Sequence, residues 1–334
     1  MHYHLTVAEE QSGIVLDQFL VGAFPNFAKA SLRRVVRDGK VLLNGGPCVP
    51  SHRLRSHDVV SVLLADEDED QLAQTAAAVG PERVEIPILY EDEHVIALDK
   101  PPHLACEPDR WDREKAHLLD SLNAQLVSRP LPPVPRIVHR LDRDTSGVML
   151  VAKTLEAERE LRTAFDEHKV EKTYLALVEG DFGLEDGQSE TIDLPLGPDS
   201  RRSGNVVVRE DGKPAQTEVS VEQRFHGFSL LRCRPLTGRT HQIRVHLAAR
   251  GFPLVVDPAY GRRKAFALSE FKVGYRKKPG RVEPSLIDRL SLHSARIVFP
   301  KVGEPGSQLT VESALPKDFS RVLKQLAKFR PARP

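Results

Sequence analysis

Residues 139–147 hold the most reactive group of side chains in the sequence: His-Arg-Leu-Asp-Arg-Asp-Thr-Ser-Gly, followed by an apolar run at 148–152. Asp142 is surrounded in sequence by three basic residues, His139, Arg140 and Arg143. Positive charge this close favours the ionised carboxylate. The apolar run predicts a buried strand, with Asp142 in the turn that leads into it. This setting predicts a nucleophile or a general base; a turn aspartate that caps backbone amides is the structural alternative.

A second group of polar side chains lies in residues 237–247, Thr-Gly-Arg-Thr-His-Gln-Ile-Arg-Val-His-Leu. A helix is expected here, with Thr240 as its N-cap and Gly251 as its C-terminal stop. Arg244 would have Leu247 at i+3, so its guanidinium would emerge beside an apolar stripe.

The elements that must position these two segments are mostly strands. Apolar and alternating patterns predict a helix at 155–168 and strands at 88–90, 95–98, 148–152, 173–178, 217–221 and 228–234. Strands and helices do not follow a steady βαβ rhythm, so the pattern favours an α+β fold with a mixed sheet over a doubly wound one.

Residues 13–63 predict a small unit of their own. Leu16, Phe19 and Leu20 share one face of a first helix, and a second helix begins near Lys29 and ends at Gly39. The second helix carries three arginines, Arg33, Arg34 and Arg37. A strand with a tight turn at 40–45 and a strand at 58–62 complete the unit. Residues 65–84 are acidic and then rich in Ala and Gln, which predicts a linker.

Length and composition fit a two-domain cytoplasmic protein. The chain has 334 residues, of which 40% are hydrophobic and 28% charged. No apolar run approaches the roughly 20 residues that a membrane helix needs, and the N-terminus lacks the pattern of a signal peptide. The three cysteines form neither a disulfide framework nor a CxxC metal pair, as expected in a reducing compartment.

The net charge of +1 conceals two basic patches. Between residues 29 and 57 there are seven Lys or Arg and one acid, and between 262 and 281 there are eight and one. Patches of this kind bind phosphate backbones, although each could also be a solvated surface.

The His-Arg-Leu-Asp sequence at 139–142 resembles the signature of the RluA family of RNA pseudouridine synthases. In that family the aspartate attacks a uridine, and the base is re-attached through carbon instead of nitrogen. Further segments resemble the family in the same order, at residues 88–101, 171–174, 235–247 and 292–300. The resemblance implies a pseudouridine synthase fold of α+β class, with a mixed, largely antiparallel sheet.

The small unit resembles an S4 RNA-binding domain, whose pattern is a basic helix, a hairpin of the Gly-x-Val-x-x-Asn-Gly type and a late strand that begins at an Asp. The expected organisation is an S4-like RNA-binding domain at 1–64, a linker at 65–84 and an RluA-type catalytic domain at 85–334. In the first domain, RNA contacts are expected from Arg33, Arg34 and Arg37.

The resemblance also implies roles for individual residues. Asp142 would attack either the base or C1′ of the uridine, and Arg244 would pair with it. Tyr174 would stack on uracil or help remove the C5 proton. Arg140 would enter the RNA and help extrude the target base, and Leu247 would pack beside the tyrosine ring. Further contacts to RNA or base are expected from Leu247, His139 and Arg239.

No cofactor and no metal are expected, because the isomerisation has no net redox change and needs only a carboxylate nucleophile. The expected partner is RNA, with ribosomal RNA favoured and tRNA possible, and no membrane is expected. His241 and His246 are five residues apart, about 500° around a helix, so they do not form a zinc pair.

Two alternatives stay open at this point. The Asp-x-Asp pair of Asp142 and Asp144 is similar to the start of Mg-dependent aspartyl phosphotransferases, although those enzymes place an apolar strand before the first Asp. A non-catalytic RNA-binding protein of the same fold is the other. Two departures from the RluA pattern concern loop shape: His103 and Val256 stand where the family usually has Gly.

Overall fold

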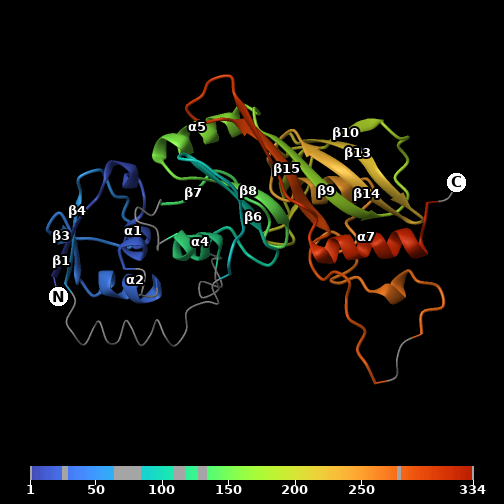
Figure 1. Ribbon diagram of the computed structural model, residues 1–334, viewed down its shortest axis with the longest axis horizontal. Coiled ribbons are helices and arrows are strands. Elements are labelled where there is room, and N and C mark those ends of the chain that lie inside the picture. The colour runs from blue at the N-terminus through green and yellow to red at the C-terminus, as the bar shows by residue number, and fades with distance from the viewer. Residues whose placement is uncertain are drawn as a thin grey trace.

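The computed structural model describes residues 2–24, 29–63, 84–107, 117–126, 134–276 and 280–332. Nearly all of the predicted linker at 65–84 lies outside the described residues. Figure 1 shows a small N-terminal domain in blue beside a larger, elongated domain built on one long sheet. No described helix is long and apolar enough to cross a membrane.

The small domain packs two helices, α1 (Leu16–Ala23) and α2 (Lys29–Arg37), on a four-stranded sheet. In the order β1-β4-β2-β3, its strands are β1 (His2–Thr6), β4 (Val59–Leu63), β2 (Val41–Leu43) and β3 (Gly46–Pro47). The helices, the hairpin and the closing strand lie where the sequence predicts them, whereas β1 was not predicted.

Local chemistry explains the hairpin of the small domain. Asn44 and Gly45 both take left-handed backbone angles, with φ 51° and 79°, as a two-residue hairpin turn requires. The Asn44 side chain donates to Asp58 Oδ1 at 2.8 Å and accepts from the Val59 amide at 2.8 Å. The predicted turn and the late Asp strand therefore hold each other in register.

The larger domain is built on a ten-stranded sheet. Its strands are β5 (Ile88–Glu91), β6 (Val95–Lys100), β7 (Arg136–Ile137), β8 (Ser146–Ala152), β9 (Glu171–Glu179), β10 (Ser189–Asp193), β13 (Gln216–Phe225), β14 (Phe228–Pro235), β15 (Leu292–Pro300) and β16 (Gln308–Glu312). The main path runs β10-β13-β14-β9-β15-β8-β6-β5, with β16 beside β15 and β7 beside β8. Only the β15–β8 pairing is parallel among those described, so the predicted mixed, largely antiparallel sheet is confirmed.

Strand β8, which follows the Asp142 turn, is buried at every position. Its side chains alternate between two cores, as the pleat of a strand requires. Met149 and Val151 share one core with helix α4 (Leu118–Leu126). Val148, Leu150 and Ala152 share the other with α5 (Leu155–Asp166), whose N-cap is Thr154. The turn with Asp142 therefore leads directly into a fully buried strand of the sheet.

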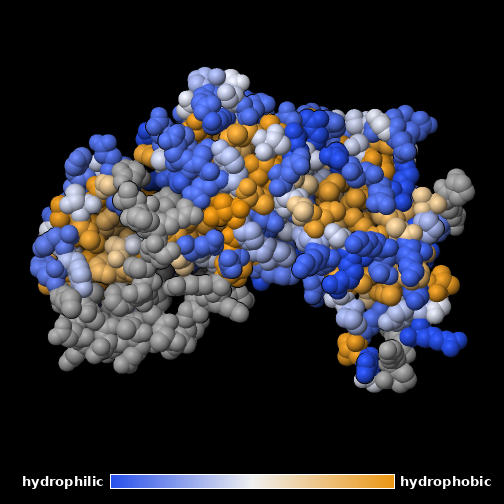
Figure 2. Space-filling view, in the orientation of Figure 1, coloured by the Kyte–Doolittle hydropathy of each residue, from blue (hydrophilic) through white to orange (hydrophobic). Residues whose placement is uncertain are grey.

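A hairpin and two helices pack near strands β9, β13 and β14. They are the hairpin β11 (Leu196–Pro198) and β12 (Val206–Val208), helix α6 (Gln242–Ala249) and helix α7 (Lys317–Phe329). Beside α7, a loop that contains part of the basic patch at 262–281 projects from the body (Figure 1). Its base is fixed by buried Phe266 and Phe271, whose rings stack at 5.0 Å. Exposed Val273 and Val282 lie on it, and Figure 2 shows hydrophobic and strongly hydrophilic surface side by side there.

The two domains touch through residues 134–136. Val134 packs against the core of the small domain. The guanidinium of Arg136 donates to the Ser12 carbonyl at 3.1 Å and to Glu158 of α5 at 3.2 Å. Gln18 of α1 donates to the Pro135 carbonyl at 3.5 Å. The small domain therefore has a direct contact with the sheet domain in addition to its covalent connection.

Candidate active site

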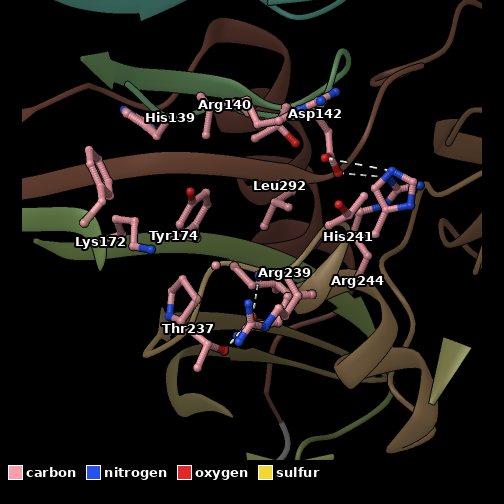
Figure 3. Close-up of a pocket in the computed structure, with 18 of the residues that line it drawn as sticks. His139, Arg140, Asp142, Lys172, Tyr174, Thr237, Arg239, His241, Arg244 and Leu292 are labelled. Carbon is pink, nitrogen blue, oxygen red and sulfur yellow. Dashed lines mark hydrogen bonds and ion pairs between the residues drawn. The ribbon is translucent and has the colours of Figure 1, made fainter. Parts of the chain in front are cut away.

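A pocket of about 480 Å³ lies beside the Asp142 turn and is lined by most of the predicted catalytic-domain site residues. Asp142, Tyr174, Arg244, His139, Arg140 and Arg239 all line it. In Figure 3, Tyr174 and Leu292 lie between the segment that carries Asp142 and the segment that carries Arg239. Leu247 does not line the pocket: it is fully buried in the same core as Tyr174, so the predicted packing fits and a direct base contact does not.

Arg244 connects the pocket carboxylate to a second, buried carboxylate. Its Nη1 donates to Asp142 Oδ2 at 2.9 Å, while Nε and Nη2 donate to the two oxygens of Asp257 at 2.8 and 2.9 Å. Burial alone would lower the pKa of Arg244, but the pairs with Asp257 and Asp142 outweigh it and raise that pKa. The guanidinium is therefore permanently charged and fixed in direction, and it presents one N–H to Asp142.

Asp257 is a site residue that the sequence did not reveal. It is fully buried, and its Oδ1 also accepts from the amides of Ala259 and Tyr260. A carboxylate that lies 13 residues after Arg244 and beyond the end of the helix has no spacing that would identify it. Only the fold brings the two side chains together.

The helix that carries Arg244 begins later than predicted, because α6 starts at Gln242. The prediction of Thr240 as N-cap is wrong: the N-cap is His241, in a left-handed conformation with φ 54°. The side chain of Gln242 accepts instead from the Arg239 amide at 3.0 Å and from the Thr237 hydroxyl at 2.7 Å. Gly251, with φ 84°, ends the helix as predicted.

Tyr174 projects into the pocket from β9 and is 9% exposed. Burial raises its pKa, and the charge of Asp142 raises it further. The phenol is therefore protonated at neutral pH. This state suits stacking and hydrogen-bond donation better than the abstraction of a proton.

Three comparisons with known proteins agree. Residues 94–249 match the family of RNA pseudouridylate synthases. The chain is 35% identical over 331 residues to ribosomal large subunit pseudouridine synthase D of Xanthomonas campestris pv. campestris, covering 96% of this chain and 91% of that one. This chain belongs to the RluA family of RNA pseudouridine synthases. It is also 33% identical to ribosomal large subunit pseudouridine synthase C of Escherichia coli K12, with 98% and 97% coverage.

A solved structure supports the same conclusion. Human RNA pseudouridylate synthase domain containing 1 superposes with a TM-score of 0.52 and 25% identity, over 70% of this chain and 84% of that one. The protein is thus an isomerase that acts on uridines in RNA. The phosphotransferase alternative and the non-catalytic alternative are not favoured.

Two buried side chains of the synthase hold the backbone of the turn that carries Asp142. Lys100, at the end of β6, donates to the carbonyls of Pro101, Leu104 and Arg143 at 2.8 to 2.9 Å. Burial lowers the pKa of Lys100 to about 8. The Cys106 thiol donates to the Leu141 carbonyl at 3.2 Å. Carbonyls on both sides of Asp142 are therefore held in place.

The two departures from the family pattern have different structural outcomes. His103 keeps the turn that usually needs Gly by adopting a left-handed φ of 63°, and its Nδ1 lies 3.0 Å from Asp144 Oδ1. Val256 is fully buried and has no left-handed backbone angle. Of the two positions, only His103 has the left-handed backbone that favours Gly.

His139 supports the motif from the wall of the pocket. Its Nε2 accepts from the Leu150 amide at 2.9 Å, and its ring packs on Phe165 at 4.7 Å. Burial, with a smaller effect of Lys172, lowers its pKa to about 3. The one acceptor nitrogen of the neutral ring is thus engaged by β8, so the structure favours a supporting role over the predicted base contact.

The predicted arginines differ in availability. Arg140 and Arg239 are exposed at the pocket, and Arg239 donates to the Pro214 carbonyl at 3.0 Å. Arg33 of the small domain is paired with buried Asp17 at 2.6 Å. Arg34 and Arg37 are exposed on α2, and Arg34 lies 3.7 Å from Asp38.

Within the part of the chain that the structure describes, no group of three His, Cys, Asp or Glu could hold a metal. His246 is buried, with its ring nitrogens 2.9 Å from the Thr217 hydroxyl and 3.0 Å from the Leu194 carbonyl. It is a structural histidine of the core.

Proposed function

We propose that this synthase isomerises uridines of ribosomal RNA, with Asp142 as the nucleophile. The observation that carries the proposal is that the two oxygens of the Asp142 carboxylate have different contacts. One oxygen accepts from permanently charged Arg244, and the carboxylate itself lines a pocket that also contains Tyr174. Relatives that match over nearly the whole chain are named for the large ribosomal subunit, which favours ribosomal RNA over tRNA.

The reaction needs no external group. The N1–C1′ bond breaks, a C5–C1′ bond forms, C5 loses a proton and N1 gains one, so atoms and charge balance. A carboxylate nucleophile divides this rearrangement into easier steps, by attack on either the base or C1′. Arg244 donates a charge-assisted hydrogen bond to Asp142, the Tyr174 ring offers a stacking face, and Leu292 forms the apolar wall beside it.

The target base must leave its stack before it reaches Asp142. Arg140 is exposed at the mouth of the pocket, two residues before the nucleophile, and is suited to enter the RNA as the base leaves. Arg239, exposed across the pocket, is suited to the phosphate backbone beside the extruded base.

The small domain is proposed to be the S4-like RNA-binding module, with boundaries at 1–64, a linker at 65–84 and the catalytic domain at 85–334. Arg34 and Arg37 of α2 are its best candidates for phosphate contacts, because both are exposed. Arg33 is instead expected to brace α2 against α1 through Asp17.

The test is a map of pseudouridines in ribosomal RNA and tRNA from cells with the intact protein, without it, and with Asp142→Asn. At least one ribosomal site should depend on the protein and be lost in Asp142→Asn, with single turnover on that RNA reduced roughly 10³-fold or more. Asp144→Asn is the matched control, since this neighbouring carboxylate contacts only His103 among the interactions described. Loss of tRNA sites alone would overturn the ribosomal target, and near-normal turnover of Asp142→Asn would overturn the nucleophile.

A further inference from the structure

A chain of polar contacts that starts in the β11–β12 hairpin ends at the carboxylate of Asp142. The Val206 amide donates to the Tyr260 hydroxyl at 2.9 Å. That hydroxyl lies 2.8 Å from His241 Nδ1. The other ring nitrogen, Nε2, lies 3.9 Å from Asp142 Oδ1 (Figure 3). The oxygen it faces is the one that Arg244 does not hold.

The direction of these contacts determines the tautomer of the imidazole. A backbone amide can only donate, so the Tyr260 oxygen accepts from Val206. Burial raises the pKa of Tyr260, so the phenol keeps its proton, and the nearest acceptor for that proton is Nδ1. Nδ1 is then an acceptor, and the hydrogen of the neutral ring is on Nε2. Burial lowers the pKa of His241, which favours the neutral ring despite Asp142 and Asp257 nearby.

The backbone of His241 is also unusual for this position. It is left-handed, with φ 54°, at the residue before the first turn of α6. Such conformations in residues other than Gly gather at functional sites, where surrounding contacts hold them. At His241 the left-handed backbone accompanies an imidazole that lines the pocket. A helix capped by Thr240, as predicted, would not have required this backbone conformation.

We propose that His241 is a positioning residue for the nucleophile: Tyr260 sets its tautomer so that Nε2–H faces Asp142 Oδ1 while Arg244 holds Oδ2. The inference rests on the proposed role of Asp142. A donor on each oxygen restricts rotation of the carboxylate and orients it for attack. At 3.9 Å the contact is longer than a hydrogen bond, but contacts in unliganded active sites often tighten only in the substrate complex.

The first test is His241→Asn, because Asn tolerates the left-handed conformation and lacks the imidazole. Single-turnover rate on saturating RNA should fall roughly 10- to 100-fold, the scale of a misplaced reacting group, while KM changes less than about twofold. His103→Asn is the matched control: it is another left-handed histidine near a carboxylate, but it does not line the pocket. Its rate should match the wild type.

The second test separates positioning from simple stability. Tyr260→Phe keeps the ring that packs on the Arg244 guanidinium at 5.0 Å and removes only the hydroxyl. Its rate should fall less than that of His241→Asn, because the imidazole can then rotate or change tautomer. In the double variant the loss should equal that of His241→Asn alone, since Tyr260 would act only through His241.

Three outcomes would overturn the inference: additive losses in the double variant, a normal rate for His241→Asn, or a loss confined to melting temperature. Asp142→Asn distinguishes this failure from failure of the proposed function. If Asp142→Asn is inactive and His241→Asn is normal, only the positioning role is wrong. If Asp142→Asn is active, the proposed nucleophile is wrong as well.

Discussion

At the residue scale, the site depends on one arginine with two carboxylate partners. Asp257 accepts from Nε and Nη2 of Arg244, and Nη1 donates to Asp142, so the guanidinium cannot turn away from the pocket. A buried ion pair adds little to stability by itself, because desolvation offsets the attraction. Here the ion pair orients the guanidinium, so that Nη1 faces the proposed nucleophile.

A residue-scale prediction concerns His139 and pH. Its folded pKa of about 3 lies below the ordinary value of 6.5, so between these values the unfolded chain binds more protons. Stability from this residue is therefore complete above pH 6.5 and is lost as the pH falls towards 3. His139→Gln keeps an acceptor for the Leu150 amide but does not titrate.

Urea unfolding of both proteins between pH 5 and 6.5 measures this effect. The wild type should lose stability more steeply on acidification, by at most about 1.4 kcal/mol per pH unit. Equal pH slopes for the two proteins would mean that His139 is not held neutral in the fold.

At the element scale, β8 and β15 must approach closely at the start of β8, just after the Asp142 turn. Gly147 has φ 108°, and a Cβ built there would lie 2.1 Å from the Ser294 carbonyl oxygen. This is the parallel pairing of the sheet, where His293 and Ser294 face Ser146 and Gly147. The glycine after the Asp142 turn is therefore required by packing between strands.

Gly147→Ala should accordingly destabilise the fold by about 3 kcal/mol or more, because backbone must move on both strands. Gly227→Ala is the matched control: it is also left-handed, with φ 80°, but a Cβ there meets nothing within 4 Å. It should cost only the backbone penalty of about 1 kcal/mol. Similar urea midpoints for the two variants would contradict the close-approach argument.

At the scale of the whole molecule, the small domain is joined to the catalytic domain by Val134 and Arg136. This contact adds to the covalent connection between the two domains. Deletion of residues 1–63 would expose Val134 and remove the Ser12 partner of Arg136. The guanidinium would keep Glu158, so the catalytic fold should survive.

The truncated protein should bind RNA more weakly and with a shallower salt dependence, since each lost phosphate contact removes about 0.7 to 0.9 from the log–log slope. Single turnover on saturating RNA fragments should change little. A full-length Arg34→Ala/Arg37→Ala variant controls for the exposed Val134. An unchanged salt slope would mean that the small domain does not contact RNA, and a collapsed turnover rate would mean that it helps build the active site.

Local patterns in the sequence determined a large part of this protein. The apolar run after Asp142 predicted a buried strand, and the Asn-Gly pair predicted a tight hairpin, because both signals depend on neighbouring residues alone. The choice of Asp142, Tyr174 and Arg244 as candidate site residues also followed from contiguous motifs. These features need no knowledge of which distant segments meet.

Only the tertiary structure determined which side chains pair with one another. Asp257 on Arg244, Tyr260 on His241 and Asp17 on Arg33 join residues whose spacing follows no helical or strand period. The left-handed start of α6 replaced the Thr240 cap that local preference favours, since contacts outside the helix outweigh a capping preference of about 1 kcal/mol. A sequence thus specifies which groups can react, and the packing of distant segments specifies their direction and charge.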